Sequence, residues 1–166
     1  MEPQGIERRE LLQWIYNNTN SWLQFAEAKN AAMIAFNVAM AAFLAEMDMP
    51  RVVFVGLIAA MAVSVWAFYP VNVKLPRISG RIVTANLLHY AYIASLERDQ
   101  YLQKLYGSYW GETNMRSGSF SQIEKDYCEE IVSNARITLR KQKCFNISFF
   151  IDVITMFLLV LLFIIT

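Results

Sequence analysis

Phe157-Leu-Leu-Val-Leu-Leu-Phe-Ile-Ile165 is the stretch of sequence that decides the fold, because it has no polar face at all. It ends an apolar segment, residues 145–165, which is long enough to cross a membrane as a helix. A bilayer core of about 30 Å takes about 20 helical residues. A soluble helical bundle with a very apolar core is the alternative, but its helices would keep a polar side toward water.

Two further apolar stretches, 31–47 and 52–69, are separated only by the turn Asp48-Met49-Pro50-Arg51. Each is near the lower limit of about 17 residues for a membrane span. Two such segments in contact shield each other, which favours a transmembrane hairpin. The hydrophobic share of the 166-residue chain, 56%, is also high for a soluble domain.

The sequence therefore predicts an all-α membrane protein, with a transmembrane helical hairpin, a cytoplasmic helical hairpin and a C-terminal transmembrane helix. The order of its parts follows from where the apolar stretches end. They are an N-terminal cytoplasmic or interfacial helix (1–30), the transmembrane hairpin (31–69), a cytoplasmic helical module (70–144) and the third transmembrane helix (145–166).

The distribution of basic residues predicts the topology. Of the 15 Lys and Arg residues, 11 lie between Tyr69 and Phe145, although the net charge is only +1. The positive-inside rule then places the N-terminus and residues 70–144 in the cytoplasm and the C-terminus in the periplasm of a multi-pass protein. Cys128 and Cys144 fall on the cytoplasmic side, so we expect free thiols rather than a disulfide. Packing is the favoured role for Cys144 and lipidation the alternative.

Local patterns predict the helices in more detail. Apolar residues at helical spacing predict a helix over 6–30, which the polar run Asn17-Asn18-Thr19-Asn20 interrupts. A second helix is predicted from about Thr84 to Tyr106, followed by a loop over 107–119. Ser121-x-x-Glu124 is a capping box, and nothing after it stops a helix before residue 165.

Small residues in the first span recur every three or four positions, which places them on one stripe of the helix. Such stripes let helices approach closely in lipid. We expect this stripe to pack against the second span, which carries Gly56, Ala59, Ala60 and Ala62. The stripe consists of Ala28, Ala32, Ala35, Ala39 and Ala42.

Catalytic chemistry is sparse in this sequence. His89 is the single histidine, and no second group stands at a spacing typical of a triad or a metal site. No glycine-rich phosphate loop is present. We expect no enzyme activity, no metal and no cofactor. A nucleic-acid polymer is not an expected partner, because acidic residues are interleaved with the basic ones.

Four polar residues lie at or inside the predicted spans. Glu27 and Lys29 flank the entry to the first span and point to different sides of the helix. Asn37 lies within that span, and Asp152 lies about two turns inside the third. An ionisable side chain at this depth costs about 3 kcal/mol and usually faces protein or water. Asp152 either lies between helices or at a pore, or stays hydrated near the interface.

A second polar set lies in the predicted cytoplasmic module. A small anionic ligand with a planar base would need cations for its phosphate, Asn for base edges and Tyr for stacking. The basic residues near 136–143 equally suit contact with anionic lipid, especially Lys141 and Lys143. The candidate ligand residues are Arg77, His89, Tyr90, Asn134, Arg136 and Arg140.

Several strings, taken in order, resemble the Pycsar transmembrane effectors over about residues 20–150. Glu27 stands where that family has Asp, and Tyr90-Ala91 replaces its aromatic-Gly pair. The strings are Trp22-Leu-Gln-Phe-Ala-Glu-Ala-Lys29, Asn37-Val-Ala-Met40, Phe68-Tyr-Pro70, Pro76-Arg77, Asn86-Leu-Leu-His-Tyr-Ala-Tyr-Ile-Ala94, Tyr101-Leu102, Ile131-Val-Ser-Asn-Ala-Arg-Ile137 and 141–146.

This resemblance implies a bacterial anti-phage effector of the inner membrane. A partner cyclase would make cyclic UMP or cyclic CMP on infection, and the effector would sense it and impair the membrane. Three thin spans cannot enclose a wide path, so we expect a homo-oligomer. A ligand-independent scaffold or regulatory subunit and a holin-like toxin are the alternatives.

Overall fold

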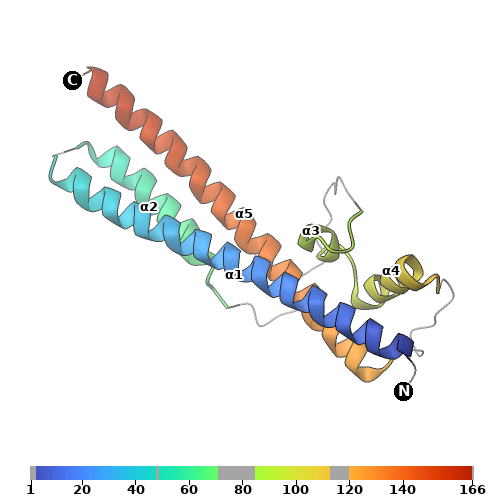
Figure 1. Ribbon diagram of the computed structural model, residues 1–166. Coiled ribbons are helices and arrows are strands. Elements are labelled where there is room, and N and C mark those ends of the chain that lie inside the picture. The colour runs from blue at the N-terminus through green and yellow to red at the C-terminus, as the bar shows by residue number, and fades with distance from the viewer. Residues whose placement is uncertain (1–2, 48, 71–84, 113–119, 166) are drawn as a thin grey trace. The chain divides into compact units, whose positions relative to one another are not determined.

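The computed structural model describes residues 3–47, 49–70, 85–112 and 120–165, and its elements there are helices without strands. The fold class predicted from the sequence is therefore confirmed for the described part of the chain. The helices, labelled in Figure 1, are α1 (Pro3–Ala45), α2 (Arg51–Trp66), α3 (Tyr90–Ile93), α4 (Arg98–Trp110) and α5 (Gln122–Ile165).

The chain divides into two compact units. Unit 1 comprises Met1–Gln24 and Val71–Leu139, and unit 2 comprises Phe25–Pro70 and Arg140–Thr166. Helices α1 and α5 each supply residues to both units. The long uninterrupted pattern after the capping box is indeed one helix, α5.

Unit 1 has a well-packed apolar core. Buried side chains come from the N-terminal part of α1, from α3 and α4, and from the N-terminal part of α5. The Tyr101 hydroxyl is inside this core and donates a 2.8 Å hydrogen bond to the Leu87 carbonyl. The start of α1 is thus part of the core rather than a separate segment. The buried set is Leu12, Ile15, Ile93, Ala94, Leu96, Tyr101, Leu102, Leu105, Tyr106, Phe120, Cys128, Ile131, Val132 and Ala135.

The predicted helix over 84–106 is wrong, because α3 ends at Ile93 and α4 begins at Arg98. Between them Glu97 is extended, and its side chain and that of Gln100 form a capping box at the start of α4. The predicted loop over 107–119 is wrong at its start, since α4 continues to Trp110. The helix ends there because Gly111 adopts φ 68°, a left-handed conformation that glycine accepts without strain.

The predicted interruption of α1 at Asn17–Asn20 is also wrong. Thr19 donates to the Ile15 carbonyl at 2.8 Å, a bond that a continuous helix allows. Asn18 donates to the Leu88 carbonyl at 3.5 Å, and Asn20 accepts from Asn134 at 2.7 Å. These asparagines bond to other segments of unit 1 instead of competing for the backbone of α1.

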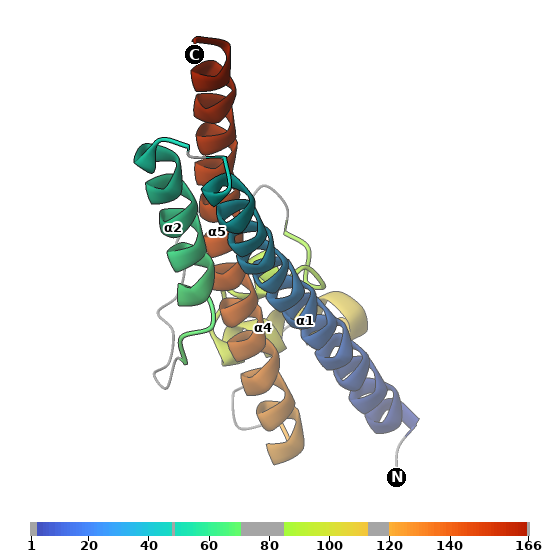
Figure 2. The same ribbon diagram turned by 90° about the vertical axis from the view of Figure 1, so that its left-hand side faces the viewer.

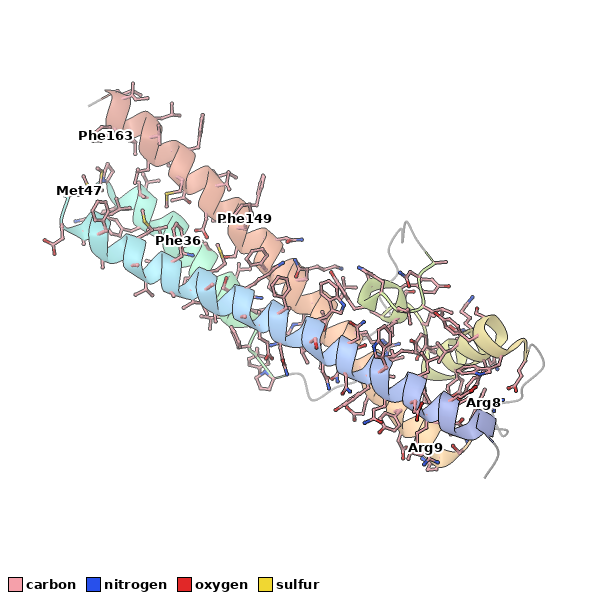
Figure 3. All side chains as sticks on the ribbon, viewed as in Figure 1. Arg8, Arg9, Phe36, Met47, Phe149 and Phe163 are labelled. Atoms are coloured by element: carbon pink, nitrogen blue, oxygen red, sulfur yellow. The ribbon has the colours of Figure 1, made fainter. Side chains whose placement is uncertain are left out.

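Arg8 closes the N-terminal end of unit 1 (Figure 3). Its guanidinium pairs with Glu112 and lies 5.1 Å from the centroid of the Tyr106 ring and 5.8 Å from that of Trp110. These contacts join α1 to α4 and to the residue after its C-cap. Stacking of a guanidinium on aromatic faces is a favourable arrangement for this cation.

Glu124 makes the stability of unit 1 depend on pH. It accepts from the Tyr106 hydroxyl at 2.6 Å and from the Ser121 backbone and hydroxyl at 2.7 Å, which confirms the predicted capping box. Burial acts to raise its pKa, but these hydrogen bonds together hold the pKa below its ordinary value. The carboxylate therefore stabilises the fold above its unfolded-state pKa, and this contribution is lost as the pH falls through the lower folded-state pKa.

We expect the melting temperature of unit 1 to fall between about pH 6 and about pH 3. Glu124→Gln should flatten this dependence, whereas Glu130→Gln, at an exposed position on the same helix, should leave it unchanged. Circular dichroism in detergent micelles measures both. Equal slopes in the wild type and Glu124→Gln would show that this carboxylate does not carry the effect.

Unit 2 consists of α2 and the parts of α1 and α5 that belong to it (Figure 2). Its cluster of large buried apolar side chains is small: Leu44 from α1 and Val53 and Leu57 from α2, with Met156 and Leu159 of α5 against them. Buried residues on α2 recur every three or four positions, at Val53, Leu57, Ala60 and Ser64. One face of α2 is therefore packed and the other is exposed.

The predicted packing of the alanine stripe against α2 is wrong. All five alanines of that stripe are exposed, and the buried residues of α1 in unit 2 are Ala26, Asn30, Asn37 and Leu44. On α2, Ala59 and Ala62 are exposed as well. On the packed face of α1, Asn30 and Asn37 donate hydrogen bonds to α5. The alanines therefore lie on the exposed face.

The outside of unit 2 is apolar to a degree unusual for a soluble protein. Among the residues that the structure describes, 27 large hydrophobic residues are exposed, and 23 of them belong to unit 2. Figure 3 shows examples in Phe36 on α1 and Phe149 and Phe163 on α5. Within the described residues, α1 over Glu7–Ala45 and α5 are long and apolar enough to cross a membrane, while α2, at 16 residues, is shorter.

Gly56 allows close contact between α2 and α5. A Cβ atom added at this position would overlap Oγ1 of Thr155. It would also lie 2.8 Å from Cγ2 and 3.0 Å from Cβ of the same residue, so the Thr155 side chain would have to shift. Thr155 is β-branched and buried, so its side chain has little freedom to move away.

We expect Gly56→Ala to destabilise unit 2 by about 1–3 kcal/mol, the usual cost of overpacking. Gly107→Ala is the matched control, because nothing lies within 4 Å of a Cβ there and the position is helical. The double variant Gly56→Ala/Thr155→Ala should recover stability. Thermal unfolding in micelles measures the three variants, and a Gly56→Ala protein as stable as Gly107→Ala would contradict the close packing.

Candidate functional site

An aromatic cluster of three residues, Trp22, His89 and Tyr90, lies in unit 1. Trp22 comes from α1, His89 is the N-cap of α3 and Tyr90 is the first residue of α3. The ring centroids of Trp22 and Tyr90 are 5.5 Å apart, those of Trp22 and His89 6.3 Å, and those of His89 and Tyr90 4.5 Å. Trp22 keeps 38% of its surface exposed, so the cluster is open to the outside of the unit.

Local structure fixes the two rings at the start of α3. The Nδ1 atom of His89 accepts a 3.2 Å hydrogen bond from the Ala91 backbone N–H, which caps the helix. In the neutral ring the proton is therefore on Nε2, which remains a donor. Burial raises the pKa of Tyr90, so its hydroxyl stays protonated and can both donate and accept.

The same face of α1 contacts this segment twice. Asn18 lies one helical turn before Trp22, and its side-chain amide contacts the Leu88 carbonyl. The sequence-based candidates His89 and Tyr90 therefore do lie together, whereas Trp22 and Asn18 were not among the candidates. Spacing in the sequence gives no signal that pairs Trp22 with the distant His89 and Tyr90.

Asn134 bonds to α1 through a different residue. Its Nδ2 atom donates to Oδ1 of Asn20 at 2.7 Å. Asn20 is two positions from both Asn18 and Trp22, so it points to a different side of α1 from the aromatic cluster. Both asparagines are only partly buried.

Arg136 has a structural role that its sequence context did not reveal. It is buried, with 8% of its surface exposed, and it donates to the carbonyls of Ala94 at 3.4 Å and Leu96 at 2.9 Å. Its guanidinium also pairs with Glu97 at 3.0 Å. These bonds hold the connection between α3 and α4 and give Arg136 a structural role, while its interpretation as a ligand-binding cation stays a prediction.

Arg140 is among the residues of unit 2. It donates to the carbonyls of Tyr69 at 3.2 Å and Trp66 at 2.9 Å, at the C-terminal end of α2. A cation at this end of a helix also complements its dipole. Arg77 lies outside the described residues.

The charged residues at the entry to the first predicted span find partners within unit 2. Glu27 pairs with Lys141 at 3.1 Å, and the Lys141 ammonium also lies 4.8 Å from the centroid of the Phe68 ring. Lys29 lies over the rings of Phe25 at 4.4 Å and Phe145 at 5.0 Å. Neither side chain pairs with the other, as the spacing predicts.

Asn37 and Asp152, the two polar residues predicted inside the spans, contact each other. Nδ2 of Asn37 donates to Oδ2 of Asp152 at 3.1 Å and also to the Met33 carbonyl at 2.9 Å. Both residues are buried, with 1% and 4% of their surfaces exposed. The pairing of α1 with α5 thus depends in part on this amide–carboxylate contact.

Unit 2 holds further buried polar residues that sequence reasoning missed. The Ser64 hydroxyl donates to the Ser148 hydroxyl at 2.9 Å, which in turn donates to the Ala60 carbonyl at 2.8 Å. Asn30 donates to the Lys141 carbonyl at 3.0 Å. The spacing of Lys141, Ser148, Asp152 and Thr155 on one helix face could have indicated such a polar interior.

The remaining reactive groups of the described residues are enclosed. Cys128 and Cys144 are free and buried, as predicted for reduced thiols. Burial raises the pKa of the Cys128 thiol to about 12, so it is not a thiolate at neutral pH. The described residues contain no group of three or more His, Cys, Asp or Glu side chains suited to a metal ion.

Comparison with known proteins gives one positive result for this chain. The family model described as the Pycsar effector protein domain matches residues 11–166, which confirms the resemblance inferred from the sequence. The matched region includes residues of both units. No curated protein and no solved structure matches.

Proposed function

This chain belongs to the Pycsar effector family, and from that premise we propose that it senses a cyclic pyrimidine mononucleotide in the cytoplasm and then impairs the inner membrane. The family gives it the role of an anti-phage defence effector, rather than of the cyclase. It also implies pairing with a cyclase and with the cyclic nucleotide that the cyclase makes. Sensing of the nucleotide and impairment of the membrane go beyond the family match, and they are what we propose.

The observation that carries the proposal is the division of the chain into two chemically different units. Unit 1 buries its aromatic and aliphatic side chains in a core, as a water-soluble domain does. Unit 2 instead exposes 23 large hydrophobic residues, which suits lipid. Helices α1 and α5 each continue from one unit into the other. A change in the packing of unit 1 on ligand binding is therefore transmitted along these helices to unit 2.

We place the ligand at the aromatic cluster. A pyrimidine base is a flat π-system, and Trp22 offers a partly exposed indole beside Tyr90. Stacking of one base on such a ring contributes about 1–3 kcal/mol. The Nε2–H of His89 and the Tyr90 hydroxyl supply hydrogen bonds. Cyclic UMP and cyclic CMP are the candidate ligands, and Arg77 remains a predicted partner for their phosphate.

We place the membrane interface at the C-terminal end of α2. Trp66 and Tyr69 stack there with ring centroids 5.3 Å apart, and both are exposed. Aromatic side chains of this kind favour the boundary between lipid and water. We propose three crossings, with the N-terminus and residues 70–144 in the cytoplasm and the C-terminus in the periplasm, because most Lys and Arg residues lie in 70–144.

Binding of cyclic nucleotides to the full chain in lipid nanodiscs tests the sensing half of the proposal. Titration calorimetry with cyclic UMP and cyclic CMP should show saturable binding, whereas cyclic AMP, cyclic GMP and the linear pyrimidine monophosphates should not compete. A chain that binds none of these nucleotides, yet kills cells whenever it is expressed, would be a ligand-independent toxin. A chain that binds only another protein would be a scaffold.

A further inference from the structure

The interior of unit 2 contains a line of buried polar side chains. On α5 they are spaced by seven, four and three residues, which keeps them on one face of the helix. From Lys141 to Thr155 this face extends about 21 Å, out of a bilayer core of about 30 Å. The buried polar residues are Asn30, Asn37, Ser64, Lys141, Ser148, Asp152 and Thr155.

At three levels of this line, side chains of different helices meet. Lys141 pairs with Glu27, Ser148 with Ser64, and Asp152 with Asn37. A helix unit whose outside is so apolar has no need of such an interior for solubility. Polar residues inside membrane helices are costly and typically line the paths of ions or protons.

Asp152 and Asn37 keep two oxygens without a partner. Oδ1 of Asp152 and Oδ1 of Asn37 are both buried, and neither has a hydrogen-bond donor among the described residues. An unpartnered buried acceptor carries a desolvation cost of about 1–3 kcal/mol. Two such oxygens, on residues that are hydrogen-bonded to each other, are acceptors for which a positive ligand would be a suitable partner.

The charge of Asp152 is not balanced by a side chain. Among the described residues, no salt bridge joins it to Lys or Arg. Lys141, already paired with Glu27, is 11 residues away on the same helix, which is about 16 Å. Near Asp152, α1 contributes uncharged groups, the side-chain amide of Asn37 and the backbone carbonyl of Met33. The other charged residues described in unit 2 are Lys29, Glu46, Arg51, Arg140 and Lys143.

We propose that Asn37 and Asp152 form a binding site for one monovalent cation, a proton or a sodium ion, and that unit 2 carries this cation across the membrane when the effector is activated. A single carboxylate is neutralised by a single positive charge. A divalent ion would leave an excess charge in a low-dielectric interior, and calcium takes six to eight oxygen ligands. The transport step rests on the proposed function, since activation requires the nucleotide.

Infrared difference spectroscopy of the full chain in vesicles tests the site without any nucleotide. Subtracting the spectrum of Asp152→Asn from that of the wild type isolates this carboxyl group. A protonated carboxyl band that disappears when choline is replaced by sodium identifies a sodium site. A protonated band that sodium leaves unchanged identifies a proton site. An ionised carboxylate that responds to neither sodium nor pH overturns the proposal.

Two further variants complete the infrared test, one as a control and one as a second probe of the site. Asp126→Asn makes the same chemical change at an exposed position of α5 in unit 1 and should leave the Asp152 signal unchanged. Asn37→Leu keeps the carboxylate but removes the second oxygen and the amide that donates to Oδ2 of Asp152, and it should change the response of the band to sodium or pH as well as its position. If Asp152→Asn fails to fold, the difference between the wild-type and Asn37→Leu spectra is used instead, and the absence of any carboxyl band from this difference contradicts a shared site.

Cation entry into the same vesicles separates this inference from the proposed function. With cyclic UMP or cyclic CMP present, sodium or proton entry should be lost in Asp152→Asn and retained in Asp126→Asn. Equal entry in both variants overturns the inference and leaves the proposed function intact. A wild type that gives the infrared signature but admits no cation with any nucleotide supports the site and contradicts the proposed function.

Discussion

Replacing Arg136 with alanine is expected to destabilise unit 1 by about 3 kcal/mol, because it leaves the carbonyls of Ala94 and Leu96 without donors, at about 1–3 kcal/mol each. Both of those residues are buried, so water cannot easily replace the guanidinium. The variant should therefore open the connection between α3 and α4. This is a folding defect and not a selective loss of ligand binding.

Alkylation of Cys128 measures this opening in intact membranes. The thiol is fully buried in the core of unit 1, so it reacts only when the unit opens. In a Cys144→Ala background, Arg136→Ala should raise the alkylation rate about 100-fold, since each 1.4 kcal/mol is a factor of about ten.

Arg98→Ala is the control for Arg136→Ala. Its ion pairs with Asp99 and Glu129 are at the surface, with 39% of the Arg98 side chain exposed, and such pairs contribute little. The alkylation rate of this variant should match the wild type. An Arg136→Ala protein that keeps Cys128 protected but no longer binds nucleotide would restore the interpretation of Arg136 as a ligand residue.

Replacing Trp22 with alanine is expected to weaken cyclic-nucleotide binding by about 1–3 kcal/mol, the contribution of one stacked base. This corresponds to an increase in Kd of about 5- to 150-fold. The indole is 38% exposed, and its removal should leave the core of unit 1 in place. Trp22→Phe should recover part of the affinity, because a phenyl ring still stacks.

Trp14→Ala is the matched control for Trp22→Ala. Trp14 is on the same helix and in the same unit, is 53% exposed, and is not part of the aromatic cluster. Calorimetry should give it the wild-type Kd. If both variants bind as tightly as the wild type, the ligand does not stack on Trp22 and the candidate site is misplaced.

The sequence singles out α1 and α5 as helices long enough to cross a membrane, because apolar length is a property of composition. It also identifies Asn37 and Asp152 as costly residues in the spans. It does not show that they face each other, because this depends on the rotation of α1 against α5. The alanine stripe fails for the same reason: the polar residues occupy the packed face of α1, and the alanines point outward.

Contacts between segments far apart in the chain account for much of what the sequence does not show. Arg136 and Arg140 look like ligand cations in a sequence, since the pattern does not reveal that each bonds to backbone carbonyls. The break between α3 and α4 carries no Pro or Gly, and it becomes explicable only when the capping box at Glu97 and the bonds from Arg136 are seen. Trp22 was missed because stacking partners far apart in sequence cannot be paired by spacing.

Collapse of an ion gradient across sealed vesicles containing the full chain tests the central claim most directly, because it joins the ligand to the membrane in one readout. Vesicles with a potential-sensitive dye should hold their gradient without nucleotide or with cyclic AMP, and lose it on addition of cyclic UMP or cyclic CMP. A gradient that survives every cyclic mononucleotide, or that collapses equally without any, would contradict the account.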